Sequence, residues 1–250
     1  MLGFLNFSSL IRPDNTNIAF SSKEMIAKTV VNEVKKNFIT APIEKKLPSK
    51  YEIESIARTN LTLRKLLAKY DLPIQVNIEE LEKLREGHLE KTRELTTKIY
   101  SVLPNELKKE INICNLQTAA LYHDYGKVLI PNHILNKRGA LTYDEREIMQ
   151  LHSQIGYELL KNSGFNEKVL NLIKYHHQNL HKNGYPYIEK DFDFGLDCQI
   201  LSIADKYTAL REERCYKNTF GKYEALEIIA KEVNKGLISQ DIFTALIRVV

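Results

Sequence analysis

The sequence predicts an all-α protein. Apolar residues recur at helical spacing along most of its 250 residues, and no segment shows a convincing run of the period-two alternation typical of strands. Two residue pairs match the capping box that opens many helices, Ser21 with Glu24 and Thr142 with Glu145, and both precede apolar repeats. We therefore expect helices throughout and no sheet.

Proline residues divide the first half of the chain into four expected helices. The first follows Ser21 and carries apolar residues from 26 to 38 on one face. The second covers residues 53–67, and Pro73 ends that region. The third covers residues 81–99, with His88 on its apolar side, and the fourth runs from Pro104 toward His123. A boundary near residue 75 would separate a helical N-terminal region of unknown role, 1–75, from a domain of residues 76–250.

The second half continues the helical pattern. The helix opened by Thr142 carries His152 on its apolar face and ends at Gly164, and the next covers residues 169–176. Residues 178–197 show few periodic signals and contain Gly184, Pro186 and Gly195, so they are expected to form a long loop. Helices are expected again near residues 200–210, 223–233 and 238–249.

Composition limits the class of protein. With 43% hydrophobic and 27% charged residues the chain has an ordinary globular composition, and its net charge of +4 suits a local anionic substrate rather than duplex nucleic acid. The three cysteines form no CxxC pair, which favours a reducing compartment. No apolar run approaches the roughly 18–20 residues of a membrane span, and the N-terminus lacks the pattern of a signal peptide. We expect a cytoplasmic protein without a membrane partner.

The histidines carry the clearest functional signal. All seven lie between positions 88 and 181, and five of them sit on or beside apolar helix faces. A single histidine in such a place is more often a satisfied core residue than a ligand. Burying five of them without a shared partner would leave many ring nitrogens without a hydrogen bond, each at a cost of about 1–3 kcal/mol. A shared metal centre that accepts their lone pairs removes this cost.

The segment from Leu121 to Lys127 adds a carboxylate to these imidazoles. At a distorted helix end, adjacent His123 and Asp124 can flank one pair of metal ions, and the two oxygens of Asp124 allow it to bridge them. Gly126 permits a tight turn, and Lys127 returns a positive charge to the same pocket. This combination suits the hydrolysis of a phosphate ester.

These residues resemble a known family. The chain is similar to the HD-GYP family of the HD-domain metal-dependent phosphohydrolase superfamily over roughly residues 80–250. The resemblance is carried by His123-Asp124-Tyr125-Gly126-Lys127, His152, the pair His176-His177, Asn183-Gly184-Tyr185-Pro186 and Ile203-Ala204-Asp205. It implies an HD-domain helical bundle of the HD-GYP type and a cyclic-di-GMP phosphodiesterase.

The resemblance also implies roles for individual residues. One metal would be held by His88, His123 and Asp205, a second by His152, His176 and His177, and Asp124 would bridge both. The substrate would be contacted by Lys127 at the scissile phosphate, by Arg214 and Lys217 at other phosphates, and by Tyr185 in the pocket wall. The metals would activate a bridging water, with Asp124 and Lys127 as catalytic residues. Two divalent ions are expected, Fe or Mn first, with Zn, Co or Ni compatible with the same ligands.

Several departures from the family pattern leave alternatives open. Leu84 stands where three-metal members usually carry a glutamate, which argues against a third metal. Gln178 replaces a common glutamate after the paired histidines, and His181-Lys182 replaces Asp-Gly. The substrate is therefore either cyclic-di-GMP, cleaved to the linear dinucleotide or GMP, or another nucleotide or phosphoester. A signalling module that binds a cyclic dinucleotide without turnover is a third hypothesis. Residues 1–75 are open to a homodimer contact or a signalling partner.

Overall fold

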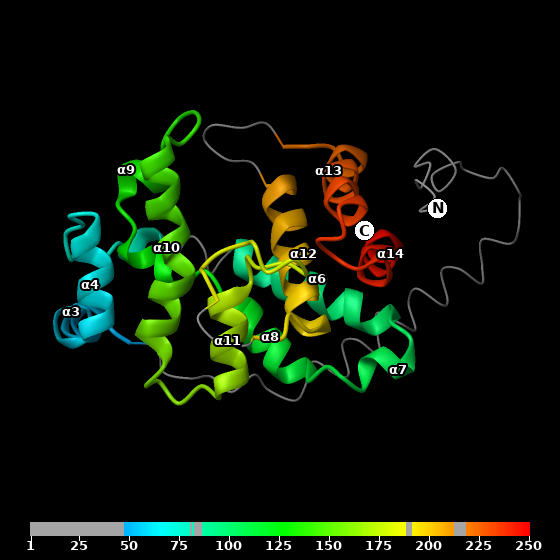
Figure 1. The fold of residues 1–250 in the computed structure, drawn as a ribbon, viewed down its shortest axis with the longest axis horizontal. Coiled ribbons are helices and arrows are strands. Elements are labelled where there is room, and N and C mark those ends of the chain that lie inside the picture. Colours follow the sequence, from blue (N-terminus) through cyan, green and yellow to red (C-terminus); the bar gives the residue numbers. More distant parts are fainter. Residues whose placement is uncertain (1–47, 81, 83–86, 189–191, 213–218) are drawn as a thin grey trace, which may run out of the picture. The chain divides into compact units, whose positions relative to one another are not determined.

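A computed structural model of the chain describes residues 48–80, 82, 87–188, 192–212 and 219–250. All elements in these ranges are helical (Figure 1), so the predicted all-α class is confirmed. The chain divides into compact units of residues 1–41 and 42–250, and the described residues belong to the second. The helix expected after Ser21 and the residues Leu84, Arg214 and Lys217 lie outside the described ranges.

No helix in the described part of the chain is both long enough and apolar enough to cross a bilayer.

Two helices stand where the sequence predicted one over residues 53–67. The first, α3, spans Lys50–Thr59 and the second, α4, spans Leu61–Lys69. The single-helix prediction is wrong because Asn60 ends α3 and caps α4, accepting a hydrogen bond from the Leu63 amide at 3.0 Å. The sequence reading also missed a capping box at Ser49 that opens α3. Both helices pack against α10 (Tyr143–Leu160).

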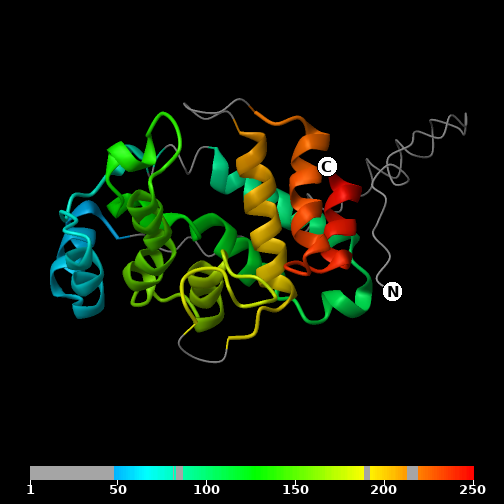
Figure 2. The same ribbon diagram turned by 45° about the horizontal axis from the view of Figure 1, so that its top comes forward.

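The core forms around α6 (His88–Val102), which packs against α8 (Ile113–Tyr122), α12 (Leu196–Arg211) and α14 (Gln240–Val249). Ile99, Leu116 and Ile203 are fully buried at these contacts. α8 also packs against α11 (Glu167–Tyr175), and α13 (Lys222–Asn234) packs against α12 and α14. Figures 1 and 2 show α12 beside α6, with α13 and α14 next to it. This core brings the end of α8 and the middle of α12 to the start of α6.

The remaining boundaries follow the sequence in part. The expected helix after Pro104 is divided into α7 (Asn105–Lys108) and α8, because the Asn112 side chain caps α8. The predicted capping box of Thr142 and Glu145 is present and opens α10. Between α8 and α10 lie the 3₁₀ helix η1 (Tyr125–Leu129) and the short helix α9 (Asn132–Leu135). Residues 178–188 and 192–195 contain no helix, which agrees with the predicted loop.

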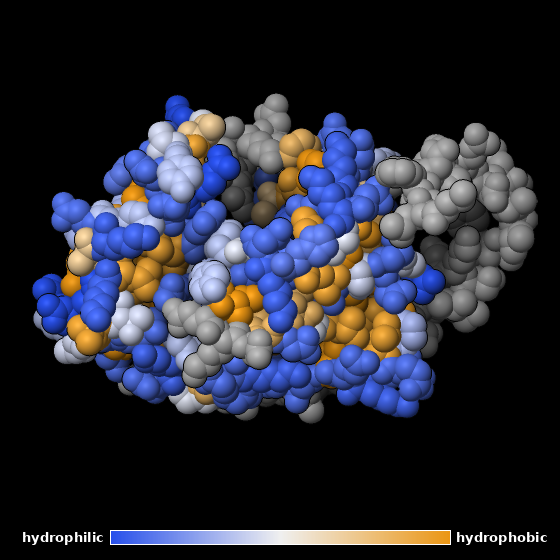
Figure 3. All heavy atoms as spheres, in the orientation of Figure 1, coloured by the Kyte–Doolittle hydropathy of each residue, from blue (hydrophilic) through white to orange (hydrophobic). Residues whose placement is uncertain are grey.

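The surface shown in Figure 3 mixes hydrophilic residues with smaller hydrophobic areas. The most exposed large hydrophobic side chains in the described residues are Tyr51, Leu61, Tyr143, Leu180, Tyr187 and Tyr223. They belong to α3, α4, α10, the loop before α12, and α13, so they are distributed over several elements.

Candidate metal centre

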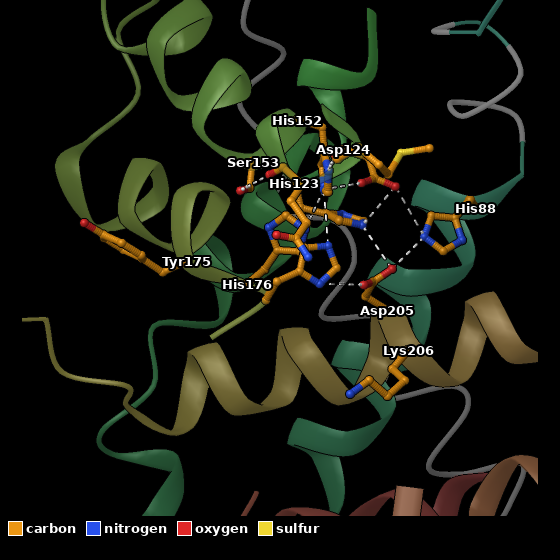
Figure 4. A network of polar contacts seen from close by, with 12 residues as sticks. His88, His123, Asp124, His152, Ser153, Tyr175, His176, Asp205 and Lys206 are labelled. Carbon is orange, nitrogen blue, oxygen red and sulfur yellow. Dashed lines mark hydrogen bonds and ion pairs between the residues drawn. The ribbon is translucent and has the colours of Figure 1, made fainter. Parts of the chain in front are cut away.

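Seven predicted donors converge although they come from five helices. His88 opens α6, His123 and Asp124 directly follow α8, His152 lies in α10, His176 and His177 directly follow α11, and Asp205 lies in α12. Figure 4 shows six of them, His177 being unlabelled, turned toward one centre. The donor atoms fall into two sets, each with all its atoms within 4.8 Å of one another. The first set holds His88, His123, Asp124 and Asp205, and the second holds His152, His176 and His177.

The first donor set is built around Asp205. Its Oδ1 atom lies 2.9 Å from His88 Nε2 and 3.4 Å from His123 Nε2. Burial alone would raise the pKa of Asp205, but the His123 and His88 imidazoles beside it hold that pKa well below its usual range. Lys206, the next residue in α12, points away from the centre in Figure 4 and pairs with Glu232. The helix therefore presents one carboxylate to the centre and a lysine to another face.

The second donor set consists of imidazoles alone. His152 Nε2 lies 3.3 Å from His176 Nε2 and 3.2 Å from His177 Nε2. Burial lowers the pKa of His152 to about 4 and that of His176 to about 3, and it lowers the pKa of His177 well below the usual value. These three rings are therefore neutral near pH 7.

Asp124 lies between the two sets. Its Oδ2 atom lies 3.5 Å from His123 Nε2, and its Oδ1 atom lies 3.3 Å from His152 Nε2. Each oxygen thus faces a different donor set. This is the arrangement in which one carboxylate can bridge two cations.

Three of the histidines are fixed in the same tautomer. His123, His152 and His176 each donate from Nδ1 to the carbonyl oxygen three residues earlier, at 2.9, 2.7 and 2.7 Å. The Nδ1 atom of a neutral ring then carries the proton, and the Nε2 lone pair points to the centre. The helix backbone therefore orients these rings as metal ligands require.

The donor set fits divalent metal ions. The fully buried His123 Nε2 atom has no hydrogen-bond partner in the described structure. With Nδ1 protonated, the Nε2 atoms of His152 and His176 face each other as two lone pairs, which repel. A cation between such atoms accepts the lone pairs and satisfies every nitrogen. Mixed imidazole and carboxylate donors suit a transition metal better than magnesium.

Gly126 has a different role from the one the sequence suggested. A Cβ atom at this position would lie 1.9 Å from the His152 carbonyl oxygen and 2.5 Å from the Gly156 amide nitrogen. Gly126 is therefore needed for backbone contact between η1 and α10 rather than for a turn with positive φ. This close approach brings Asp124, two residues before Gly126, next to His152.

Lys127 lies inside the centre. Its Nζ atom donates to Asp124 Oδ2 at 2.6 Å, and its side chain is 15% exposed. Burial would raise the pKa of Asp124, but Lys127, His123 and His152 hold it well below its usual range. Asp124 is therefore ionised and available as an acceptor.

The comparisons with known proteins agree with this geometry. The family model described as "HD domain" matches residues 75–241. The chain belongs to the HD-domain family. The predicted resemblance to the HD-GYP branch is confirmed by curated relatives named as cyclic di-GMP phosphodiesterases. The match to the HD-domain family model includes every donor residue of the two sets.

Three curated proteins illustrate the similarity of this HD domain to known enzymes. A "Cyclic di-GMP phosphodiesterase" of Thermotoga maritima is 34% identical, over 56% of this chain and 38% of its own length. The "Cyclic di-GMP phosphodiesterase response regulator RpfG" of Xanthomonas campestris is 29% identical, over 79% and 55%. The "3'3'-cGAMP-specific phosphodiesterase 1" of Vibrio cholerae is 30% identical, over 58% and 35%. The chain thus spans about a third to a half of the length of these relatives.

Among solved structures, this HD domain is similar to Bd1817, a HDG"Y"P protein from Bdellovibrio bacteriovorus. The TM-score is 0.49 at 16% identity, and the alignment covers 90% of this chain and 79% of the other.

The loop after the paired histidines covers one side of the centre. The Tyr185 ring lies against His177, with ring centroids 4.5 Å apart. Burial raises the pKa of Tyr185 well above its usual value, so its hydroxyl stays protonated. A Cβ atom at Gly184 would lie 2.2 Å from the His177 carbonyl oxygen, which explains why a glycine precedes Tyr185.

Gln178 holds this loop in place. It is 2% exposed, its Nε2 atom donates to the Pro186 carbonyl at 2.5 Å, and its Oε1 atom accepts from the Gly184 amide at 3.1 Å. A glutamate could accept one of these bonds but, when ionised, could not donate the other. The departure from the family pattern at Gln178 therefore has a structural reason in this HD domain.

The sequence analysis missed one residue at the centre. Glu212 contacts His88 Nδ1 through Oε2 at 2.8 Å. Burial lowers the pKa of His88, but hydrogen bonds to Asp205 and Glu212 raise it to about 9. The available signal was spacing, because Glu212 lies seven residues after Asp205, two turns along the same helical face. His133 and His181, which the resemblance gave no ligand role, are exposed and belong to neither set.

Proposed function

We propose that this HD domain is a phosphodiesterase that binds two divalent metal ions and hydrolyses a cyclic dinucleotide. Cyclic-di-GMP is the proposed substrate, and the linear dinucleotide or GMP is the product. The observation that carries the proposal is the position of Asp124 between two donor sets, with one oxygen toward each. The names of the relatives from Thermotoga and Xanthomonas support the choice of substrate.

The proposed ligands divide between two ions. His88, His123 and Asp205 would hold the first, His152, His176 and His177 would hold the second, and Asp124 would bind both. Iron or manganese is proposed first, and zinc, cobalt or nickel would suit the same donors. Two bound ions would supply the charge that makes a shared water acidic and that stabilises the oxygens of the transferring phosphoryl group.

The chain's own residues complete the proposed chemistry. Lys127 would stabilise negative charge on the scissile phosphate, since its ammonium group already lies in the centre and has a flexible stem. Tyr185 would contact the substrate from the pocket wall, where its protonated hydroxyl can donate a hydrogen bond. Arg214 and Lys217 would bind further phosphates, and this assignment rests on the sequence motif alone.

The experiment that tests this function combines metal analysis with turnover. Protein purified without oxygen is analysed for bound metals and then incubated with cyclic-di-GMP, while the linear dinucleotide and GMP are separated by chromatography. We expect two metals per chain and product formation that an Asp124→Ala variant abolishes. Metal-replete protein that binds cyclic-di-GMP but releases no product would instead favour a non-catalytic signalling module.

A second candidate substrate is 3'3'-cGAMP. It is favoured by the relative from Vibrio cholerae, which is 30% identical and is named as specific for that molecule. The two substrates differ in one base, so parallel kcat/KM measurements on both separate the candidates. Cleavage of non-cyclic phosphoesters alone would support the broader alternative of another nucleotide or phosphoester.

Three further sequence predictions belong to this proposal. A domain boundary near residue 75 agrees with the start of the family match, but α3 and α4 lie in the same compact unit as the donors, so the boundary stays a prediction. Residues 1–75 are proposed as the contact for a second copy or a signalling partner. A cytoplasmic location also stays a prediction.

A further inference from the structure

His88 is oriented differently from three of the other donor histidines. His123, His152 and His176 each direct Nδ1 to a carbonyl oxygen one turn earlier in their own chain segment. α6 begins at His88, with Gly87 as its N-cap, so the described residues of this helix place no carbonyl oxygen one turn before the His88 ring. An imidazole at this position needs an acceptor from another element if its Nε2 lone pair is to face the centre.

The end of α12 supplies this acceptor. Glu212, the C-cap residue of α12, places Oε2 2.8 Å from His88 Nδ1, while Asp205 places Oδ1 2.9 Å from His88 Nε2. The two carboxylates are two helical turns apart and so lie on one face of α12. α12 therefore holds both sides of the His88 ring.

Lys91 adds a weaker contact to this arrangement. It follows His88 by three residues in α6, and its Nζ atom lies 3.7 Å from Glu212 Oε1. The Lys91 side chain is 64% exposed and that of Glu212 is 18% exposed. An exposed ion pair of this length contributes little. The closer and more buried contact of Glu212 is the one to His88.

We propose that Glu212 is a positioning residue for the first metal ion. Its carboxylate fixes the His88 proton on Nδ1 and increases the basicity of Nε2, as a charged partner does more strongly than a neutral carbonyl. The first donor set then binds its cation more tightly than the set of His152, His176 and His177. The inference rests on the proposed metal centre. It adds that the first of the two sites has the higher affinity for a metal ion.

Cobalt(II) titration of the metal-free full chain tests the inference. Visible absorption, read against a competing chelator, resolves two binding steps in the wild type, and His88→Ala identifies the step that belongs to the first set. Glu212→Ala should weaken that step about 10–100-fold and leave the other unchanged. Glu212→Gln should weaken it less, because the amide oxygen can still accept from Nδ1. Glu90→Gln, an acid-to-amide change in α6 where Glu90 pairs with Arg93, is the matched control and should change neither step.

The outcomes separate the inference from the proposed function. If both Glu212 variants titrate like the wild type, or if the weakened step is the one that His88→Ala leaves intact, the positioning role is wrong. If the wild type binds no cobalt, the metal centre fails and the inference fails with it. A merely structural role would lower stability and weaken both steps alike. Helical circular dichroism confirms folding, and should Glu212→Ala not fold, the isosteric Glu212→Gln decides.

Discussion

Asp124 reaches His152 with one carboxylate oxygen, Oδ1, at 3.3 Å from Nε2, although the two residues come from different helices. Its other oxygen faces His123. The contact depends on the close approach of η1 to α10 at Gly126. One carboxylate therefore places an oxygen against each of the two donor sets.

Asp124→Asn should weaken both metal sites together. An amide lacks the charge and the second anionic oxygen that bridging requires, so the loss should exceed the roughly 10–100-fold that changes to outer-sphere partners cost. Elemental analysis after dialysis measures it. Asp144→Asn, at an exposed position in the first turn of α10, is the control. Loss of only one metal would contradict a bridging role.

Lys127→Met should reduce turnover while leaving the metals bound. Lys127 is not in either donor set, but its ammonium group lies 2.6 Å from Asp124 Oδ2, where the proposed reaction would develop negative charge on the phosphate. Removing one such charged donor costs on the order of 10²–10³-fold in kcat. Steady-state kinetics on cyclic-di-GMP gives the value. The control is Lys109→Met, at an exposed lysine at the end of α7, which should leave kcat unchanged. An unchanged kcat in Lys127→Met would show that Lys127 does not take part in the reaction.

Gln178→Glu should disturb the loop that carries Tyr185. The carboxylate keeps the acceptor for the Gly184 amide but places a negative oxygen against the Pro186 carbonyl. We expect a rise in KM with a smaller change in kcat, because the loop is proposed to contact the substrate whereas the metal donors stay in place. Gln178→Ala, which removes both bonds, should raise KM at least as much. Equal KM values in all three proteins would show that the loop does not need this side chain.

Most of the donor residues were predictable because their residue types and positions in the sequence indicate their chemistry. Histidines on apolar faces and an adjacent His-Asp pair mark buried polar groups that need a partner. Asp205 was predicted from the family resemblance alone, and the structure brings all seven together. Their role as ligands stays a prediction. Glu212 was missed because its meaning depends on where the end of α12 meets the start of α6, which is a tertiary contact. Its spacing of seven residues from Asp205 places both on one face of α12, but that spacing alone does not distinguish Glu212 from a surface glutamate.

The helix boundaries were missed where one side chain competes with the backbone. Asn60 and Asn112 interrupt apolar repeats that continue on both sides, and each ends up as a cap. The period of the apolar residues does not reveal a helix boundary at such an asparagine. Its side-chain oxygen replaces a backbone hydrogen-bond partner without changing the apolar pattern. Gly126 was correctly singled out but for the wrong reason, since the contact that requires it lies in α10.

The same two asparagines give a stability prediction. Asn60 caps α4 and also donates to Glu158 of α10 at 2.7 Å, whereas Asn112 caps α8. Asn112→Ala should cost about 1 kcal/mol. Asn60→Ala should cost about 2 kcal/mol, since it also leaves the buried Glu158 carboxylate with one partner fewer. Urea unfolding followed by circular dichroism compares the variants. Equal losses would mean that the link from α4 to α10 adds no stability.

The metal-free protein should be most stable near neutral pH. The pKa of His152 is lowered to about 4 and that of His176 to about 3, so below pH 6.5 the unfolded chain binds protons that the folded chain does not. Stability therefore falls as the pH drops from about 6.5 toward these values. The pKa of His88 is raised to about 9, so its contribution is fully present below about pH 6.5 and is lost as the pH rises through 9.

Urea unfolding in the presence of a chelator, from about pH 5 to about pH 9, measures both limbs of this dependence. His88→Gln isolates the alkaline limb: it keeps a polar side chain between Asp205 and Glu212 but cannot titrate, so stability above pH 6.5 should become flat while the acid limb remains. The acid limb should persist because it comes from His152 and His176, whose rings Figure 4 shows apart from His88. A wild type whose stability does not decline between pH 6.5 and 9 would mean that Asp205 and Glu212 do not hold a proton on His88 in the metal-free state.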